Sequence, residues 1–289
     1  MTGFSKKKFF GILVIVYIFC FLFISPSLSQ GWKEVSGEHF IVYFLDNEGF
    51  ANDVLRNAEI FYRQIAIEIG YPRYSEFWTW DKRVKIYIYQ DRDTFIKATS
   101  QPAWSEGMAD YTNKQILSYA WSQGFMESLL PHEMAHLIFR DFVGFKGEIP
   151  LWLDEGVAQW AEEPKRAYVK AMAKKLYQGD QLITLDDMMK LKLDNFKEKD
   201  RVYIRPNRTK DGSEGVLFIS GDNFISTYYL QSVSLVGFLI ERYGSDSFAN
   251  LCRQLRDGKS LDEALRFTYP VQIRSLSELE NAWRKHLAE

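Results

Sequence analysis

The chain of 289 residues contains little cysteine and little histidine. Its two cysteines are Cys20, inside an apolar N-terminal run, and Cys252, so the chain after that run has no internal disulfide. The stability of this part must therefore come from packing or from a bound metal. Only four histidines are present, and two of them, His132 and His136, stand four residues apart.

An excess of positive charge is also absent. The chain has 36 lysines and arginines against 38 acidic residues, which gives a net charge of -2. Nucleic-acid-binding proteins usually carry a strongly basic face, so we expect no nucleic-acid partner. Hydrophobic residues make up 46% of the chain, enough to bury a core in one large domain or in two modest ones.

One long uncharged apolar run stands near the N-terminus. It spans Phe9–Ile24, follows Lys6–Lys8, and precedes the small-residue site Ser27–Ser29. This order is typical of a signal peptide, here residues 1–29, with cleavage after Ser29. The alternative is an uncleaved anchor, although a membrane span usually needs about 20 residues. In either case we expect an exported protein (periplasmic, extracellular or in the cell envelope) that meets a membrane only through this segment.

The hydrophobic patterns predict an α+β fold, with strands before residue 142 and mostly helices after it. Strands are expected over 39–46 and 83–90, and residues 106–120 should form a hairpin whose first arm is an edge strand. Helices are expected over 52–69, 91–99, from 126 or 131 to 142, from about 152, and over 164–178, 185–191, 227–243, 245–256 and 275–287. The polar stretch 195–216 predicts a long surface loop.

The stretch PHEMAHLIF, residues 131–139, carries chemistry. Residues four apart on a helix lie on one side, so His132 and His136 can bind one divalent cation at about 2.0–2.1 Å. Glu133 is rotated by about 100° from His132, where it can take a proton from a water on the metal without being a ligand. The alternative is a helix with two packed or exposed histidines. The apolar flanks argue against it, because buried polar groups need partners.

A catalytic zinc usually has three protein ligands and one open position. Eighteen residues separate His136 from Glu155, which lies in PLWLDEGVAQWAEE. The two segments together resemble the gluzincin metallopeptidases, in which a glutamate on the helix after H-E-x-x-H is the third ligand. The resemblance therefore implies His132, His136 and Glu155 as ligands of one Zn²⁺ per chain. No third histidine follows the motif closely, so the chain does not resemble the metzincins.

Further segments, from HFIVYF to SLSELENAWRKHL, resemble the bacterial peptidase MA-like domain family in the same order. The resemblance covers most of residues 38–288. It implies a thermolysin-like (zincin) catalytic domain, with a small mixed β-sheet and the active-site helices in residues 30–162. A helical C-terminal lobe would follow in residues 163–289.

The resemblance implies an exported zinc metallopeptidase that acts on peptides or proteins, with Glu133 as general base. In STYYLQSVSLV, Tyr229 is the candidate donor to the tetrahedral oxyanion, although a tyrosine at helical spacing also fits a core. Asp154 and Glu162 are candidates for orienting the ligand imidazoles. The segment EGMADY lacks the glutamate of the aminopeptidase motif GAMEN, which favours endopeptidase action. The alternative function is a non-catalytic, zinc-stabilised binding domain.

Overall fold

The computed structural model describes residues 31–71, 78–103, 105–120, 124–144, 149–191, 202–208, 214–269 and 271–289; for 202–208 and 214–222 it describes the backbone alone. The expected N-terminal signal segment and residues 195–201 and 209–213 of the expected loop lie outside the described residues. Two compact units are distinguished, Met1–Trp32 and Lys33–Glu289, and the second holds the fold discussed below. Within the described residues, no helix is long and apolar enough to cross a membrane.

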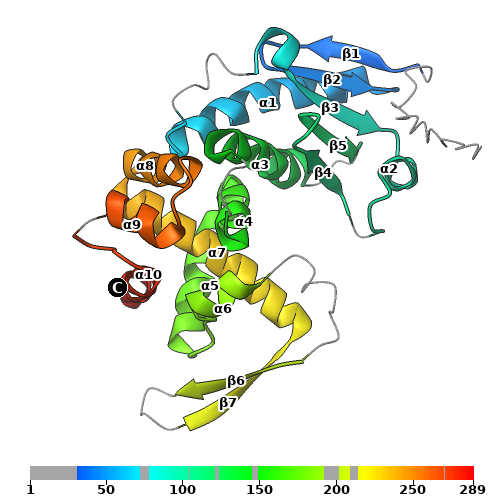
Figure 1. The fold of residues 1–289 in the computed structure, drawn as a ribbon. Coiled ribbons are helices and arrows are strands. Elements are labelled where there is room, and N and C mark those ends of the chain that lie inside the picture. Colours follow the sequence, from blue (N-terminus) through cyan, green and yellow to red (C-terminus); the bar gives the residue numbers. More distant parts are fainter. Residues whose placement is uncertain are drawn as a thin grey trace, which may run out of the picture. The chain divides into compact units, whose positions relative to one another are not determined.

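The fold is mixed α+β, as predicted, and begins with a five-stranded mixed sheet (Figure 1). Its strands are β1 (Lys33–Ser36), β2 (Phe40–Phe44), β3 (Val84–Tyr89), β4 (Gly107–Asp110) and β5 (Gln115–Tyr119), in the order β1-β2-β3-β5-β4. The three inner strands run parallel, and β1 and β4 are antiparallel edges. The prediction that residues 106–111 form an edge strand is confirmed for β4.

Every second residue of the central strand is apolar and buried, so one face of the sheet packs into the core. In β3, Val84, Ile86 and Ile88 are buried, whereas the residues between them are partly exposed. Helix α1 (Glu48–Glu68) packs against β1 and β2, and α2 (Arg92–Thr99) packs against β3 and β5. Asn47 caps the start of helix α1, and its side chain accepts a hydrogen bond from the backbone amide of Phe50 in the first turn.

Two consecutive helices follow the sheet and carry the motif residues. A π-helical turn, Phe125–Leu129, leads directly into α3 (Leu130–Val143), and α4 (Leu151–Trp160) comes next. Helix α3 packs against α1, β4 and α4, so it lies between the sheet and the helical part of the chain (Figure 1). Pro131 stands in the first turn of α3, where the missing amide hydrogen costs nothing.

The remaining chain is mostly helical. Its helices are α5 (Arg166–Gln178), α6 (Leu185–Lys190), α7 (Gly221–Tyr243), α8 (Ser245–Arg256), α9 (Leu261–Thr268) and α10 (Leu276–Ala288). Short 3₁₀ turns stand at Trp80–Lys82 and Glu163–Lys165. The prediction of a loop over 195–216 was wrong in part, because β6 (Val202–Arg208) and β7 (Glu214–Ser220) pair as an antiparallel hairpin. Helix α7 also starts six residues earlier than predicted, and α9 was not predicted.

Helices α4 and α7 approach each other closely, and two glycines make this approach possible. A Cβ on Gly156 would lie 2.5 Å from the backbone oxygen of Ser232 on α7. A Cβ on Gly237 would lie 2.5 Å from the ring of Trp160 on α4. Both distances are too short for real side-chain atoms. The close packing holds α4, and with it the neighbouring Glu155, firmly against the helical core.

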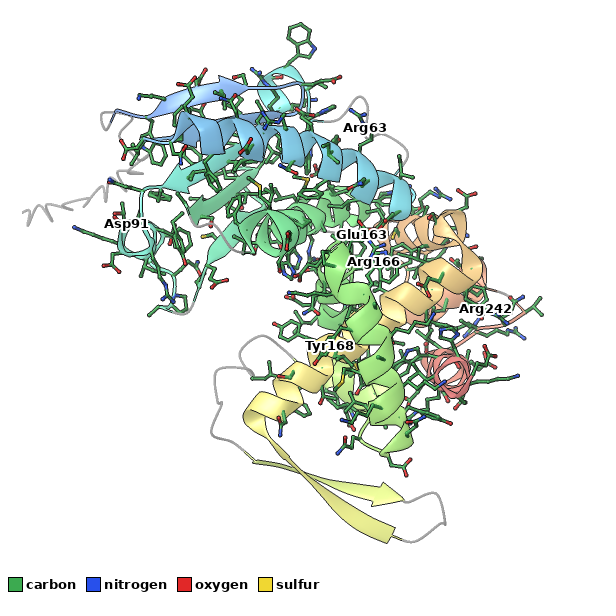
Figure 2. All side chains as sticks on the ribbon, turned by 180° about the vertical axis from the view of Figure 1, so that it is seen from behind. Arg63, Asp91, Glu163, Arg166, Tyr168 and Arg242 are labelled. Atoms are coloured by element: carbon green, nitrogen blue, oxygen red, sulfur yellow. The ribbon has the colours of Figure 1, made fainter. Side chains whose placement is uncertain are left out.

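Arg166 ties the end of α1 to the start of α5, and Figure 2 labels it at this junction. Its Nη1 donates to Glu68 Oε1 at 3.2 Å, and its Nη2 donates to the other oxygen of that carboxylate. The guanidinium also lies 4.0 Å from the ring centroid of Trp160. A bidentate arginine–carboxylate pair of this kind fixes orientation as well as distance.

Candidate metal centre

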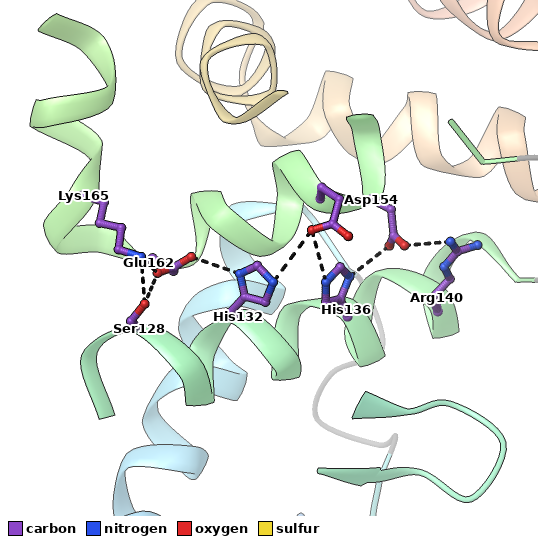
Figure 3. A network of polar contacts seen from close by, with 8 residues as sticks. Ser128, His132, His136, Arg140, Asp154, Glu162 and Lys165 are labelled. Carbon is purple, nitrogen blue, oxygen red and sulfur yellow. Dashed lines mark hydrogen bonds and ion pairs between the residues drawn. The ribbon is translucent and has the colours of Figure 1, made fainter. Parts of the chain in front are cut away.

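The side chains of His132, His136 and Glu155 converge where α3 meets α4 (Figure 3). One ligand atom from each residue lies within 4.8 Å of the other two. Glu155 Oε2 is 3.9 Å from His132 Nε2 and 3.8 Å from His136 Nε2. The four-residue spacing of the histidines on α3 produces this convergence, because it turns both rings toward the same side of the helix.

The outer nitrogen of His132 is held by Glu162, which follows α4. His132 Nδ1 lies 3.0 Å from Glu162 Oε1. The other oxygen, Oε2, accepts from the hydroxyl of Ser128 and pairs with the ammonium of Lys165. Because Glu162 is an acceptor, the proton of a neutral His132 ring belongs on Nδ1, and Nε2 presents a lone pair toward Glu155.

The outer nitrogen of His136 faces a second carboxylate in the same way. Asp154 Oδ1 lies 3.3 Å from His136 Nδ1, which is an ion-pair distance outside a well-formed hydrogen bond. Arg140, one turn further along α3, donates from Nη2 to Asp154 Oδ2 at 2.7 Å. Each imidazole is therefore backed by a carboxylate that has its own cationic partner, as Figure 3 shows.

Burial and nearby charge move the pKa values of these groups in directions that keep the outer carboxylates ionised. Burial alone would raise the pKa of Glu162, but the hydrogen bond and charge of His132, with Lys165 and Ser128, lower it. Burial likewise opposes ionisation of Asp154, and His136 and Arg140 together lower its pKa. The pKa of Glu155 is raised, chiefly by burial, although both histidines oppose the change.

His136 is only 6% exposed, and its protonation reflects the carboxylates around it. Burial alone would lower its pKa, but the nearby carboxylate of Asp154, with the charges of Glu155 and Glu133, raises it to about 9. In the metal-free protein a proton on this ring would compensate part of the surrounding negative charge. A cation bound between the rings would supply the same compensation.

The residues at this position fit a divalent cation. In a tetrahedral zinc site with bonds of about 2.0–2.2 Å, neighbouring ligand atoms lie about 3.3–3.5 Å apart, and the two nitrogen–oxygen distances found here exceed that by about half an ångström. Imidazole and carboxylate are ligands that zinc accepts. Four carboxylates (Glu133, Asp154, Glu155 and Glu162) and two cationic side chains (Arg140 and Lys165) surround the rings. When all six are ionised, they leave an excess of two negative charges, which a divalent cation would balance.

A cleft of about 270 Å³ opens beside His132, the first of the three candidate ligands. His132 and Glu133 line it from α3, and Gly107 lines it from β4. Within the described part of the chain, Glu133 has no hydrogen bond or ion pair, so its carboxylate is available to a bound molecule. Gly107 keeps the strand close to the helix, because a Cβ there would lie 2.7 Å from the side chain of Leu129.

The tyrosines of α7 lie near the same site. Tyr228 is fully buried, whereas Tyr229 is partly exposed and packs against the core. Burial raises the pKa of both phenols, and the charge of Glu155 adds to the effect. Sequence reasoning singled out Tyr229, and the structure brings it within the electrostatic range of Glu155.

Four other residues near the site were not singled out by the sequence analysis. Ser128, Lys165 and Arg140 hold the two outer carboxylates, and Tyr111 packs its ring edge-on against His136, with centroids 6.3 Å apart. Burial raises the pKa of Tyr111, as do the charges of Asp154, Glu133 and Glu155, which outweigh Arg140. The only sequence signal for Arg140 was its place one helical turn after His136, and the other three become neighbours through folding.

No family model matches the chain, and no curated protein matches its sequence significantly.

Proposed function

We propose that the protein is an exported, zinc-dependent peptidase of the gluzincin type with a thermolysin-like catalytic domain. The observation that carries the proposal is the convergence of two imidazole Nε2 atoms and one glutamate oxygen beside a cleft. A carboxylate lies against the outer nitrogen of each ring, and both inner nitrogens face Glu155. His132, His136 and Glu155 would hold the ion.

A bound zinc ion would act there as a Lewis acid and lower the pKa of water at its open position. Glu133 would accept a proton from the attacking water at its carboxylate and deliver it to the departing amine. Its position next to His132 and on the wall of the cleft supports this role. Tyr229, on α7, would donate a hydrogen bond to the developing oxyanion.

The arrangement of the sheet supports a peptide as substrate. Strand β4 pairs with β5 on one side and forms the edge of the sheet on the other. An extended peptide can add to such an edge through main-chain hydrogen bonds. Because β4 packs against α3, a peptide on this edge would pass along the cleft beside Glu133. The absence of a glutamate after Met108 leaves endopeptidase action as our proposal.

A zinc-stabilised binding domain without catalytic activity remains the alternative. It needs the three ligands and their supporting carboxylates but has no use for Glu133. A carboxylate without a described partner on the wall of the cleft favours the enzyme. The two hypotheses therefore differ in peptide cleavage: the enzyme should cleave peptides and lose this activity in Glu133→Gln, whereas the binding domain should cleave none.

The test is to measure the metal content of purified residues 30–289, of His132→Ala and of Glu133→Gln, followed by cleavage of a peptide library. We expect about one zinc per chain in the parent and in Glu133→Gln, and none in His132→Ala. Only the parent should cleave peptides. A folded parent that takes up no zinc after dialysis against the metal would refute the proposal, and zinc without cleavage would favour the binding domain.

The N-terminal segment decides where the enzyme acts. We propose export through residues 1–29, either with cleavage after Ser29 or with the segment kept as an anchor. The intact mass of the exported protein distinguishes these two forms, and retention of the full chain in the cytoplasm would contradict both.

A further inference from the structure

The proposed reaction requires hydrogen-bond donors near the candidate metal ligands. Negative charge develops on the carbonyl oxygen of the substrate as water attacks, and donors directed at that oxygen stabilise it. Most donors close to the site already have partners. Ser128 and Lys165 are bound to Glu162, and Arg140 is bound to Asp154. Glu133 and Glu155 are acceptors when ionised.

Tyr111 follows β4 directly and lies over α3. The strand's residues Gly107 and Ala109 pair with Ser118 and Ile116, which are buried, so this face of β4 is turned toward the core and α3. Gly107 and Ala109 are small, so this part of β4 lies close to α3. Tyr111 is the first large side chain on this face after them.

The position of the Tyr111 ring is fixed by two contacts with α3. The ring stands at 89° to that of His136, and the guanidinium of Arg140 lies 5.8 Å from its centroid. The side chain is partly buried, so it is held in place and still reaches solvent. These contacts place the phenol beside the ligand group, at the end of the edge strand.

The hydroxyl of Tyr111 is available as a donor. Its described contacts are those of the ring with His136 and Arg140, and no hydrogen bond of the hydroxyl is found among the described residues. A phenol remains protonated near neutral pH, so its proton can be donated in a hydrogen bond.

We propose that the Tyr111 hydroxyl donates a hydrogen bond to the substrate carbonyl oxygen as negative charge develops on it. This inference rests on the proposed peptidase function. Tyr111 would act from the end of β4, beside His136, and Tyr229 would act from α7. The two hydroxyls would then approach the reacting carbonyl from different parts of the fold.

A simpler role for Tyr111 is packing alone, in which its ring only holds His136. The two roles predict different effects of removing the oxygen. Tyr111→Phe keeps the ring and its contact with His136, but removes the donor. Tyr111→Leu removes the ring as well. Tyr168→Phe is the matched control, because Tyr168 is 62% exposed on α5 (Figure 2) and lies outside the site.

The experiment uses residues 30–289 loaded with zinc and compares the parent with Tyr111→Phe, Tyr111→Leu and Tyr168→Phe. For each protein we measure zinc content, melting temperature, and kcat and KM for a cleaved peptide. The affinity for a phosphinic peptide, whose tetrahedral oxygens imitate the oxyanion, is measured by calorimetry. For Tyr111→Phe we expect unchanged zinc content, melting temperature and KM, a kcat lower by about 10²-fold, and phosphinic-peptide binding weaker by about tenfold or more. Tyr168→Phe should match the parent.

A Tyr111→Phe variant with parental kcat and phosphinic-peptide affinity would overturn the inference and leave the peptidase proposal intact. Loss of zinc in Tyr111→Phe would also overturn it, because it would assign the residue to support of the ligands. A parent that binds zinc but neither cleaves peptides nor binds the phosphinic peptide would refute both proposals together.

Discussion

His132 Nδ1 lies 3.0 Å from Glu162 Oε1, although the two residues are thirty positions apart in the chain. The contact joins the first turns of α3 to the segment after α4. It fixes both the ring orientation and the tautomer of His132, because the carboxylate accepts the Nδ1 proton. Ser128 and Lys165 in turn hold Glu162, so the orientation of the ring depends on three elements of the fold.

Glu162→Gln should therefore weaken zinc binding without removing a ligand. Loss of a supporting carboxylate of this kind typically lowers metal affinity by about 10–100-fold. Competition with a chelator of known affinity measures the change. Glu163→Gln is the control, since Glu163 is the exposed neighbour labelled in Figure 2 and should retain parental affinity. Equal zinc affinity in the two variants would mean that Glu162 has no part in orienting His132.

Glu133→Gln should separate metal binding from catalysis. The amide is nearly the same size as the carboxylate but cannot accept the proton of the attacking water, and general-base catalysis typically contributes about 10²–10⁴-fold. We expect kcat to fall by at least that range, with zinc content and melting temperature unchanged. Residual activity close to the parental value would exclude Glu133 as the general base.

The spacing of the motif residues made the centre of the site predictable. His132 and His136 meet because they are four apart on one helix, and that relation depends on local geometry alone. Glu155 required a resemblance to other proteins, since no periodicity connects α3 with α4. Tyr111 could not be identified in advance, because its contact with His136 depends on how β4 packs against α3.

Two errors in the fold prediction have different causes. Helix α9 carries a local signal that was overlooked, because Ser260 and Glu263 form a capping box at its start. The hairpin of β6 and β7 was predicted to be a loop because its sequence is polar and charged, and β6 also contains Pro206. Proline removes a ladder donor and usually argues against a strand, although a two-stranded hairpin has free edges on which it is tolerated.

Removal of zinc should lower the stability of the folded protein. The ion would balance the carboxylates buried around His132 and His136, and a ligand that binds only the folded state stabilises it by mass action. At a free zinc concentration about 1,000 times the dissociation constant, the effect is about 4 kcal/mol. Thermal unfolding with and without a chelator measures it. The chelator should have no effect on His132→Ala; an equal shift in that variant would show that the stabilising ion binds elsewhere.

The close packing of α4 on α7 leads to a prediction about Gly156, the residue after Glu155. In Gly156→Ala the new methyl group would meet the backbone oxygen of Ser232 at 2.5 Å, so one helix must shift. Overpacking of this kind usually destabilises a protein by about 1–3 kcal/mol. The shift would also displace Glu155, so zinc affinity should fall together with stability. Chemical denaturation of the zinc-free protein and chelator competition measure the two effects separately.

Gly179→Ala is the matched control, because a Cβ there meets only side-chain atoms of Gln181 at 3.5 Å, an ordinary contact. That control should change stability by less than about 0.5 kcal/mol. If Gly156→Ala lost stability but kept parental zinc affinity, the position of Glu155 would not depend on the contact between α4 and α7.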